Sequence, residues 1–182
     1  MTAEPDVILI NGPSSSGKSS VIEALRPMLE RPYFVMSSDL LVDGGALPDL
    51  EGGYGLNTEW QSLRPAFFDG FHRAVAAMAH SGNPLIVEHV LEQEDWYEDC
   101  VRLLDGLDVL WIGVTAEADT LDERERARGD RSPGEGRSHL EGGVHDAVNY
   151  DLFLDTSDRT PAEVASQIAS AVRRRSRSSQ RG

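Results

Sequence analysis

A segment near the N-terminus has the residue types and the spacing needed to bind a polyphosphate. Glycines let backbone N–H groups turn toward phosphate oxygens, a lysine can reach the β and γ phosphates, and a hydroxyl directly after it can bind Mg²⁺. We therefore predict that the segment binds ATP, with Lys18 on the phosphates and Ser19 as a magnesium ligand. Its residues are Gly12, Pro13, Ser14, Ser15, Ser16, Gly17, Lys18, Ser19 and Ser20.

The alternative for this segment is a turn rich in glycine and serine that binds nothing. The flanking sequence argues against it. An apolar, β-branched run at 7–10 precedes the segment, and a helical pattern at 20–25 follows it before Pro27. Because a phosphate loop requires a strand before it and a helix after it, the context favours the functional interpretation.

Asp39 follows the apolar run 33–36, where the second expected strand ends. A carboxylate at that position can accept a hydrogen bond from an alcohol and take its proton during phosphoryl transfer. The alternative is a helix N-cap, because aspartate is a favoured capping residue. Beside a phosphate loop we favour Asp39 as the catalytic base.

Glu88 ends the apolar run 85–87, and His89 follows it. An acidic residue at such a strand end is similar to the second motif of phosphate-loop proteins, whose carboxylate holds Mg²⁺ directly or through water. We predict Glu88 as a magnesium ligand, with a substrate contact or a structural hydrogen bond as alternatives. For His89 we favour local hydrogen bonding over a substrate contact.

Arginines cluster near the end of an expected helix, at Arg124, Arg126, Arg128 and Arg131. Guanidinium groups can neutralise the charge that spreads over the oxygens of a transferring phosphate. The alternative is a surface helix with weak ion pairs, which suits Arg126. We predict that Arg128 and Arg131 are catalytic residues on a mobile lid, because flexible residues follow them.

The elements that must position these residues alternate between strand-like and helix-like segments, which predicts a parallel sheet covered on both faces and thus a three-layer α/β domain. Ligands of such sheets bind at the carboxyl ends of the strands, where the phosphate loop emerges. Two segments, 43–57 and 124–143, interrupt the alternation and are expected to be mobile. Strands are expected at 6–11, 33–37, 85–88, 108–114 and 150–155, and helices at 18–29, 60–80, 95–104, 118–128 and 161–174.

Composition limits the classes of partner. The chain has 182 residues and a formal net charge of −14, which argues against a nucleic-acid partner. No apolar run is long enough to cross a membrane.

We expect one domain over 1–172 and a basic, disordered tail over 173–182. A single cysteine, Cys100, excludes an internal disulfide and suits the cytoplasm, and the oligomeric state stays open.

Several of these motifs occur in the order found in the chloramphenicol phosphotransferase family, which the chain resembles over nearly its whole length. The resemblance implies a P-loop kinase fold with strand order 2-3-1-4-5, Asp39 as base, and Arg128 and Arg131 near the transferred phosphate. It also implies that ATP donates phosphate to a primary hydroxyl of an antibiotic. The matching segments are 10–20, Ser38-Asp39, 108–114, 125–131, Val144-His145, Tyr150-Asp151 and Asp155-Thr156.

Two segments depart from the family pattern. Glu88 and His89 stand where family members carry paired aspartates, and 43–57 matches no family pattern. Both lie on the acceptor side, so the kinase chemistry carries over more directly than the acceptor does. We expect an ATP- and Mg²⁺-dependent phosphotransferase acting on a small-molecule hydroxyl, with an antibiotic such as chloramphenicol as one candidate. The alternatives are a toxin-like nucleotide-sugar kinase and a non-catalytic nucleotide-binding regulatory module.

Overall fold

The computed structural model describes residues 4–49, 58–128 and 133–179. Within these residues the strands form one five-stranded sheet with the order β2-β3-β1-β4-β5, and every neighbouring pair is parallel. The predicted α/β fold and strand order are therefore confirmed. The strands are β1 (Val7–Asn11), β2 (Phe34–Ser37), β3 (Leu85–His89), β4 (Val109–Thr115) and β5 (Leu152–Asp155).

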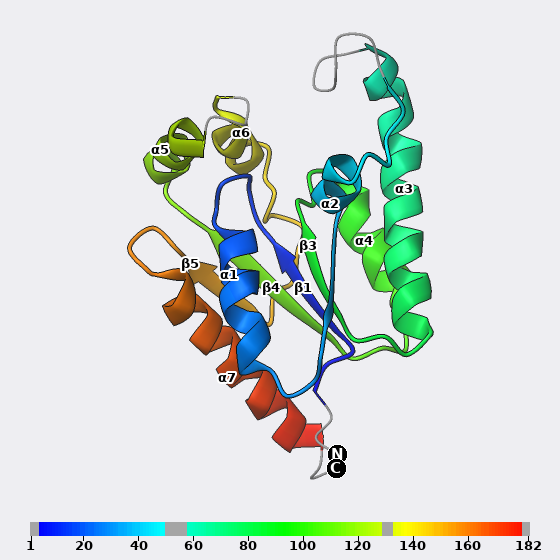
Figure 1. The fold of residues 1–182 in the computed structure, drawn as a ribbon, viewed down its shortest axis with the longest axis vertical. Helices are drawn as coiled ribbons and strands as arrows, with labels where there is room; N and C mark the ends of the chain where they lie inside the picture. The colour runs from blue at the N-terminus through cyan, green and yellow to red at the C-terminus, as the bar shows by residue number, and fades with distance from the viewer. Residues whose placement is uncertain (1–3, 50–57, 129–132, 180–182) are drawn as a thin grey trace.

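Helices cover both faces of the sheet. Figure 1 shows α1 and α7 on one side and α3 and α4 on the other, so the domain has three layers. Among the described residues, no helix is long and apolar enough to cross a membrane. The helices are α1 (Lys18–Leu25), α2 (Ser38–Asp43), α3 (Thr58–His80), α4 (Glu94–Leu103), α5 (Ala118–Arg128), α6 (Glu135–Glu141) and α7 (Pro161–Ser179), with a 3₁₀ turn η1 (Arg26–Met28) after α1.

The central strand β1 divides the hydrophobic core into two parts. Ile8 and Ile10 pack toward α1 and α7, whereas Val7 and Leu9 pack toward α3 and α4. Side chains alternate between the faces of a strand, so a strand covered on both faces must be apolar throughout. Burying each such side chain stabilises the fold by about 1.5–3 kcal/mol. The phosphate loop thus continues from the most deeply buried strand.

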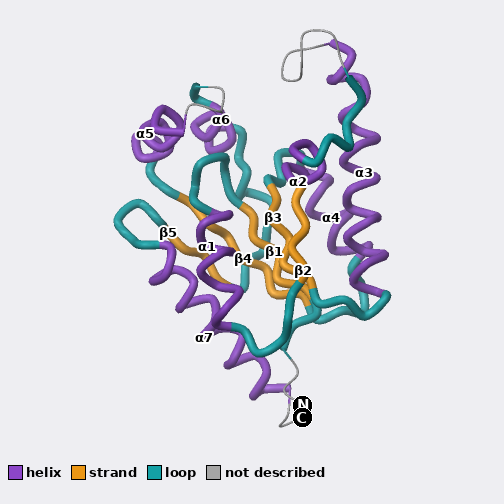
Figure 2. Tube along the Cα trace, viewed as in Figure 1, coloured by secondary structure: helices purple, strands orange, loops and turns teal. Residues whose placement is uncertain are grey.

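The carboxyl ends of the strands gather the segments with candidate functional residues. In Figure 2 the segments that follow β1, β2 and β3 leave the sheet at the same edge. The helices α5 and α6 lie side by side beyond that edge, next to the phosphate loop. The sheet therefore brings together segments that are far apart in the sequence.

The segment expected to be a flexible connection after α5 contains a helix instead. Gly134 precedes α6 with a φ of 82°, in the left-handed region that favours glycine. The carboxylate of Glu125, which is only 3% exposed, accepts hydrogen bonds from the N–H groups of Gly134 and Gly136 at 2.7 and 2.6 Å. A side chain from α5 thus caps α6, which no pattern within α6 indicates. Arg131 lies outside the described residues, and the mobility of the lid stays a prediction.

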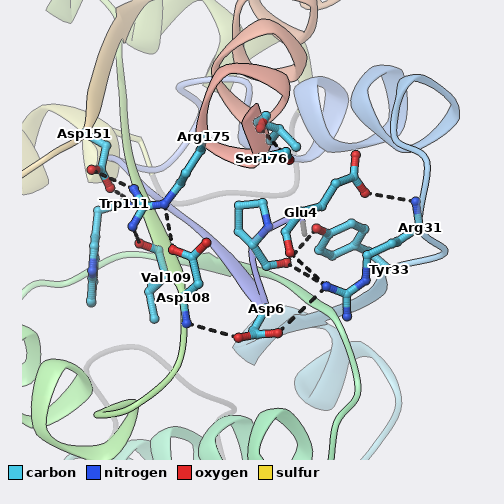
Figure 3. Close-up of polar contacts among 12 residues, drawn as sticks. Glu4, Asp6, Arg31, Tyr33, Asp108, Val109, Trp111, Asp151, Arg175 and Ser176 are labelled. Carbon is cyan, nitrogen blue, oxygen red and sulfur yellow. Dashed lines mark hydrogen bonds and ion pairs between the residues drawn. The ribbon is translucent and has the colours of Figure 1, made fainter. Parts of the chain in front are cut away.

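The basic C-terminal segment also differs from the expectation. We predicted a disordered tail from residue 173, but α7 continues to Ser179. Arg175 explains the difference, because its guanidinium donates to Asp108 Oδ1 at 2.6 Å, to Asp151 Oδ1 at 2.9 Å and to the carbonyl of Val109 at 3.0 Å (Figure 3). The last turns of α7 are thereby attached to the amino edge of the sheet. The prediction is wrong for 173–179.

Candidate active site

The phosphate loop owes its shape to two glycines. Gly12 lies against β4 so closely that a Cβ atom would collide with the carbonyl oxygen of Val114. Gly17, with a φ of 89°, is the residue before α1. Ser15 also has a positive φ, 62°, which is uncommon outside glycine. The backbone therefore takes the tight turn that the motif predicted between β1 and α1.

Lys18 lies inside this turn. Its side chain is buried, and its Nζ donates hydrogen bonds to the carbonyl oxygens of Gly12 and Pro13 at 3.0 and 2.8 Å. The ammonium is thus held at the loop, close to where the N-terminus of α1 presents its backbone N–H groups. Positive charge and N–H donors at one point favour an anion such as a phosphate.

Ser19 and Glu88 are brought together from α1 and β3. The Ser19 hydroxyl donates a hydrogen bond to Glu88 Oε1 at 2.9 Å. Hydroxyl and carboxylate oxygens suit Mg²⁺, which is usually bound by one or two protein groups together with substrate phosphates and water. Among the described residues no group of three or more His, Cys, Asp or Glu side chains could hold a metal. The pair therefore fits a magnesium ion shared with a nucleotide, and does not fit a metal held by the protein alone.

A cavity of about 580 Å³ opens at the carboxyl edge of the sheet. Lys18, Ser19, Asp39, Glu88 and Arg128 all line it. These residues come from α1, α2, β3 and α5, and each was predicted as a site residue from a separate sequence pattern. The structure therefore places them around one space that can hold the phosphates of a nucleotide together with an acceptor.

Asp39 lies in the first turn of α2, but it is not the cap of that helix. The N-cap is Ser37, whose hydroxyl accepts a hydrogen bond from the N–H of Leu40 at 3.1 Å. The capping alternative for Asp39 is therefore wrong. Since Asp39 also lines the cavity, its position agrees with a role toward the acceptor.

The first half of α3 forms a further side of the cavity that no sequence pattern had indicated. Trp60, Phe67 and Phe68 form an aromatic wall there. Arg64 lies over the ring of Phe68, with its guanidinium carbon 5.0 Å from the ring centre, and pairs with Glu92 at 2.5 Å. The aromatic residues between 60 and 68 were the available signal, but their pattern is also that of a helix that only covers the sheet.

His89 lies beside this wall and also lines the cavity. Its ring is nearly parallel to the rings of Phe68 and Trp96, with centroid distances of 5.8 and 5.6 Å, and its Nε2 is 2.7 Å from Nε2 of His72. Complete burial, then the neighbouring His72, lower the pKa of His89 well below its ordinary value. His89 is therefore neutral, and the interpretation as a local hydrogen-bonding residue is supported.

A second cavity, of about 380 Å³, lies on the other side of the phosphate loop, between α5 and the start of α7. Arg124 and Thr156 line it, and Arg124 donates to the carbonyl and hydroxyl oxygens of Thr156 at 2.7 and 3.0 Å. Arg128 lines both cavities. The second cavity thus extends from the phosphate loop toward the turn after β5.

A comparison with known protein families agrees with this geometry. The model of the family described as chloramphenicol phosphotransferase-like protein matches residues 5–173. The chain belongs to this family. The resemblance found in the sequence is thereby confirmed. None of the curated proteins compared with the chain matches it.

Solved structures similar to this family member include a resistance protein and small-molecule kinases. A tunicamycin resistance protein from Deinococcus radiodurans is 23% identical, with 93% of this chain and 95% of that chain covered and a TM-score of 0.65. A gluconokinase from Sinorhizobium meliloti 1021 is 19% identical, with 96% and 95% covered and a TM-score of 0.66. A shikimate kinase from Acinetobacter baumannii, solved in complex with shikimate, is 15% identical, with 94% of each chain covered and a TM-score of 0.64.

At these identities the likeness shows the fold. Together, family membership and the kinase fold of the neighbours support a P-loop phosphotransferase.

Proposed function

We propose that the protein is an ATP- and Mg²⁺-dependent phosphotransferase that moves the γ phosphate onto a hydroxyl of a small molecule. The observation that carries the proposal is the shared cavity, which Lys18, Ser19, Asp39, Glu88 and Arg128 line together. A nucleotide-hydrolysing switch or motor transfers phosphate to water, so it needs no acceptor-sized space beside a candidate base. A phosphate loop and a candidate base around one cavity therefore favour transfer of a phosphoryl group to an acceptor.

Each residue of the cavity has its own role in the proposed reaction. The loop amides and Lys18 bind the phosphates, and Arg128 neutralises charge that develops on the transferred phosphoryl group. Asp39 orients the acceptor hydroxyl and takes its proton as the new oxygen–phosphorus bond forms. Ser19 and Glu88 hold Mg²⁺, which supplies further charge neutralisation on the phosphates. Arg131 is proposed as a second lid arginine from its sequence position alone.

The acceptor is proposed to be a small alcohol with an apolar part. The aromatic wall of Trp60 and Phe67 favours such a molecule, since rings and alkyl groups gain most from burial against aromatic side chains. An antibiotic such as chloramphenicol fits this description, and the names of the similar structures add gluconate, shikimate and tunicamycin to the panel. A nucleotide sugar is less favoured, because the segment 43–57 on the expected acceptor side carries Asp43, Asp49 and Glu51, whose negative charges would disfavour its diphosphate.

The decisive experiment is a transfer assay with radiolabelled ATP and a panel of hydroxyl-bearing antibiotics and metabolites. Wild-type protein should label at least one acceptor. Asp39→Asn should lower the turnover number by about 100-fold or more, the usual contribution of a positioned base. Asp43→Asn is the matched control, because Asp43 is an exposed residue of the same helix and should keep wild-type turnover.

Each outcome of this assay separates two hypotheses. Near-normal turnover of Asp39→Asn would exclude Asp39 as the base. ATP binding without transfer to any acceptor would favour the regulatory module, and loss of ATP binding in Lys18→Ala would then still identify the phosphate site.

A further inference from the structure

The helix α6 makes hydrogen bonds to Ser14 of the phosphate loop. His139 Nδ1 accepts a hydrogen bond from the Ser14 N–H at 3.1 Å, and Glu135 Oε2 accepts one from the Ser14 hydroxyl at 3.2 Å. Gly136 lies between them, so close that a Cβ atom there would come within 2.6 Å of the Ser14 carbonyl oxygen. Consecutive turns of α6 thus rest on the loop that is proposed to bind phosphate.

The contacts of His139 determine where its proton lies. Since Nδ1 accepts from Ser14, the neutral imidazole carries its hydrogen on Nε2, which is 3.6 Å from Glu92 Oε1. The other oxygen of Glu92 accepts from Arg64. Burial has the largest effect on the pKa of His139 and lowers it, and Lys18 lowers it further.

Four charged groups face His139. Glu92, from the segment after β3, and Glu135, from α6 itself, favour the protonated ring, whereas Lys18 from α1 and Arg64 from α3 oppose it. The combined effect of burial and these charges is that the pKa of His139 lies below the ordinary histidine value. In this structure, the ring is therefore neutral at neutral pH.

A bound phosphate would reverse this balance. His139, Ser14 and Lys18 all line the large cavity, so a phosphate held by Lys18 brings negative charge close to the imidazole and cancels the effect of the lysine cation. Phosphate oxygens only accept hydrogen bonds. A lone pair on Nδ1 facing them is unfavourable, whereas an imidazolium could donate to the phosphate from Nδ1 and to Glu92 from Nε2.

We propose that His139 is a phosphate-contacting residue that takes up one proton from solvent when nucleotide binds. The inference rests on the proposed function, because it requires a nucleotide in the large cavity. His139 would exchange its bond with Ser14 for a charge-assisted bond to the phosphate, and would form a pH-dependent cation in addition to Lys18 and Arg128. Nucleotide binding would then become proton-linked.

The sign of the linkage follows from the two states. The pKa of His139 is lower without the phosphate and higher beside it, so protonation accompanies binding at a pH between the two values. Nucleotide affinity should therefore rise as the pH falls through that interval, by at most about tenfold per pH unit for one proton. Above the higher value the linkage disappears.

The test is isothermal titration calorimetry at pH 7.0 in two buffers of different ionisation enthalpy. The probe is the β,γ-methylene analogue of ATP with Mg²⁺, without acceptor, so that no transfer occurs. Wild-type protein should take up about half a proton or more per bound nucleotide beyond the uptake of His139→Asn. Asparagine at 139 can still accept from the Ser14 N–H but does not titrate, and His139→Gln, which reaches toward Glu92, should behave in the same way.

A matched control is His80→Gln. His80 lies at the far end of α3, where its Nε2 is 3.0 Å from the carbonyl oxygen of Leu103, and this variant should keep the wild-type proton uptake. Equal proton uptake in wild-type protein and in the two His139 variants, with nucleotide binding intact, would overturn the inference and leave the proposed function standing. Absence of nucleotide binding to the wild-type protein would overturn the proposed function, and this inference with it.

Discussion

At the residue scale, several polar side chains and N–H groups of the phosphate loop already have partners within the protein. Lys18 donates to two loop carbonyls, Ser14 is bonded to α6, and Ser19 is bonded to Glu88. A neutral hydrogen bond contributes about 1 kcal/mol net, whereas one to a charged group contributes about 1.5–3 kcal/mol. The bonds of Lys18 and of Ser19 already include a charged partner, so bonds to phosphate or Mg²⁺ would replace them with interactions of a similar kind. The side chains are held close to their proposed ligands, which limits the rearrangement that binding requires.

The Ser19 and Glu88 pair gives the prediction at this scale. Ser19→Ala and Glu88→Gln should each raise the Mg²⁺ concentration needed for half-maximal transfer by about 10- to 100-fold, the range found when groups around a metal are removed. Activity measured against Mg²⁺ concentration tests this. Glu23→Gln, an exposed change on α1, should leave the curve in place. An unaltered Mg²⁺ requirement in Glu88→Gln would assign Glu88 a structural role instead.

At the scale of elements, α5 and α6 form one unit that is attached to the phosphate loop. Glu125 of α5 caps α6, and Arg137 of α6 reaches back to Asp119 and Asp122 of α5 at 2.9 and 2.7 Å. Gly136 allows the close approach to Ser14. A movement of α6 away from the loop would therefore move α5, and with it Arg128. This attachment gives a physical basis for a lid that responds to nucleotide.

The close approach of Gly136 leads to a prediction about α6. Gly136→Ala should push α6 away from the loop, with a cost of about 1–3 kcal/mol for the added methyl group. Hydrogen exchange of the α6 amides should become faster, and nucleotide affinity should change. Gly70→Ala is the matched control, because Gly70 is also helical and a Cβ atom there meets nothing within 4 Å.

The control should behave in the opposite way. Alanine at 70 should stabilise the protein by about 0.5–1 kcal/mol through helix propensity. If Gly136→Ala also stabilises the protein and leaves exchange in α6 unaltered, the helix does not depend on its contact with Ser14.

At the scale of the whole molecule, the two edges of the sheet differ in the features that they carry. The carboxyl edge carries the cavity, whereas the amino edge is held together by polar contacts between distant segments (Figure 3). There the buried carboxylate of Glu4 accepts from the N–H groups of Glu30 and Arg31, and the Tyr33 hydroxyl donates to the carbonyl of Pro5 at 2.7 Å. Together with Arg175, these contacts attach the N-terminal segment, the approach to β2 and the end of α7 to one another. The polar contacts that stabilise the amino edge are thus separated in space from the proposed active site.

Arg175 allows this separation to be measured. Arg175→Ala removes hydrogen bonds to two carboxylates and a carbonyl. The free energy of unfolding should fall by about 1–3 kcal/mol, a range that allows for the weaker contribution of partly exposed ion pairs. Urea unfolding measures the loss. The turnover number of the folded variant should equal that of the wild-type protein. Arg173→Ala, two residues earlier and exposed, should change stability by less than about 0.5 kcal/mol.

Features with a local signal could be predicted from the sequence. The phosphate loop, the strand ends near Asp39 and Glu88, and the start of α7 after Thr160 were all predicted from local patterns. Thr160 and Glu163 indeed form a reciprocal cap, with the Thr160 N–H donating to Glu163 Oε2 at 2.8 Å. Such signals lie within a few residues of the feature they specify. The extent of α7 beyond residue 174 was not predicted, because it depends on Asp108 and Asp151.

The sequence by itself determined that this chain has a parallel α/β fold and a phosphate site, because glycine spacing and apolar runs act through the local backbone. Only the tertiary structure decided which side chains meet the phosphate loop. Ser14 and His139 are separated by 125 positions in the sequence, and their hydrogen bond depends on how α6 docks onto the loop. A contact between segments so far apart produces no periodicity and no spacing. It exists because the sheet brings the ends of its strands to one edge, where residues without any local relation become neighbours.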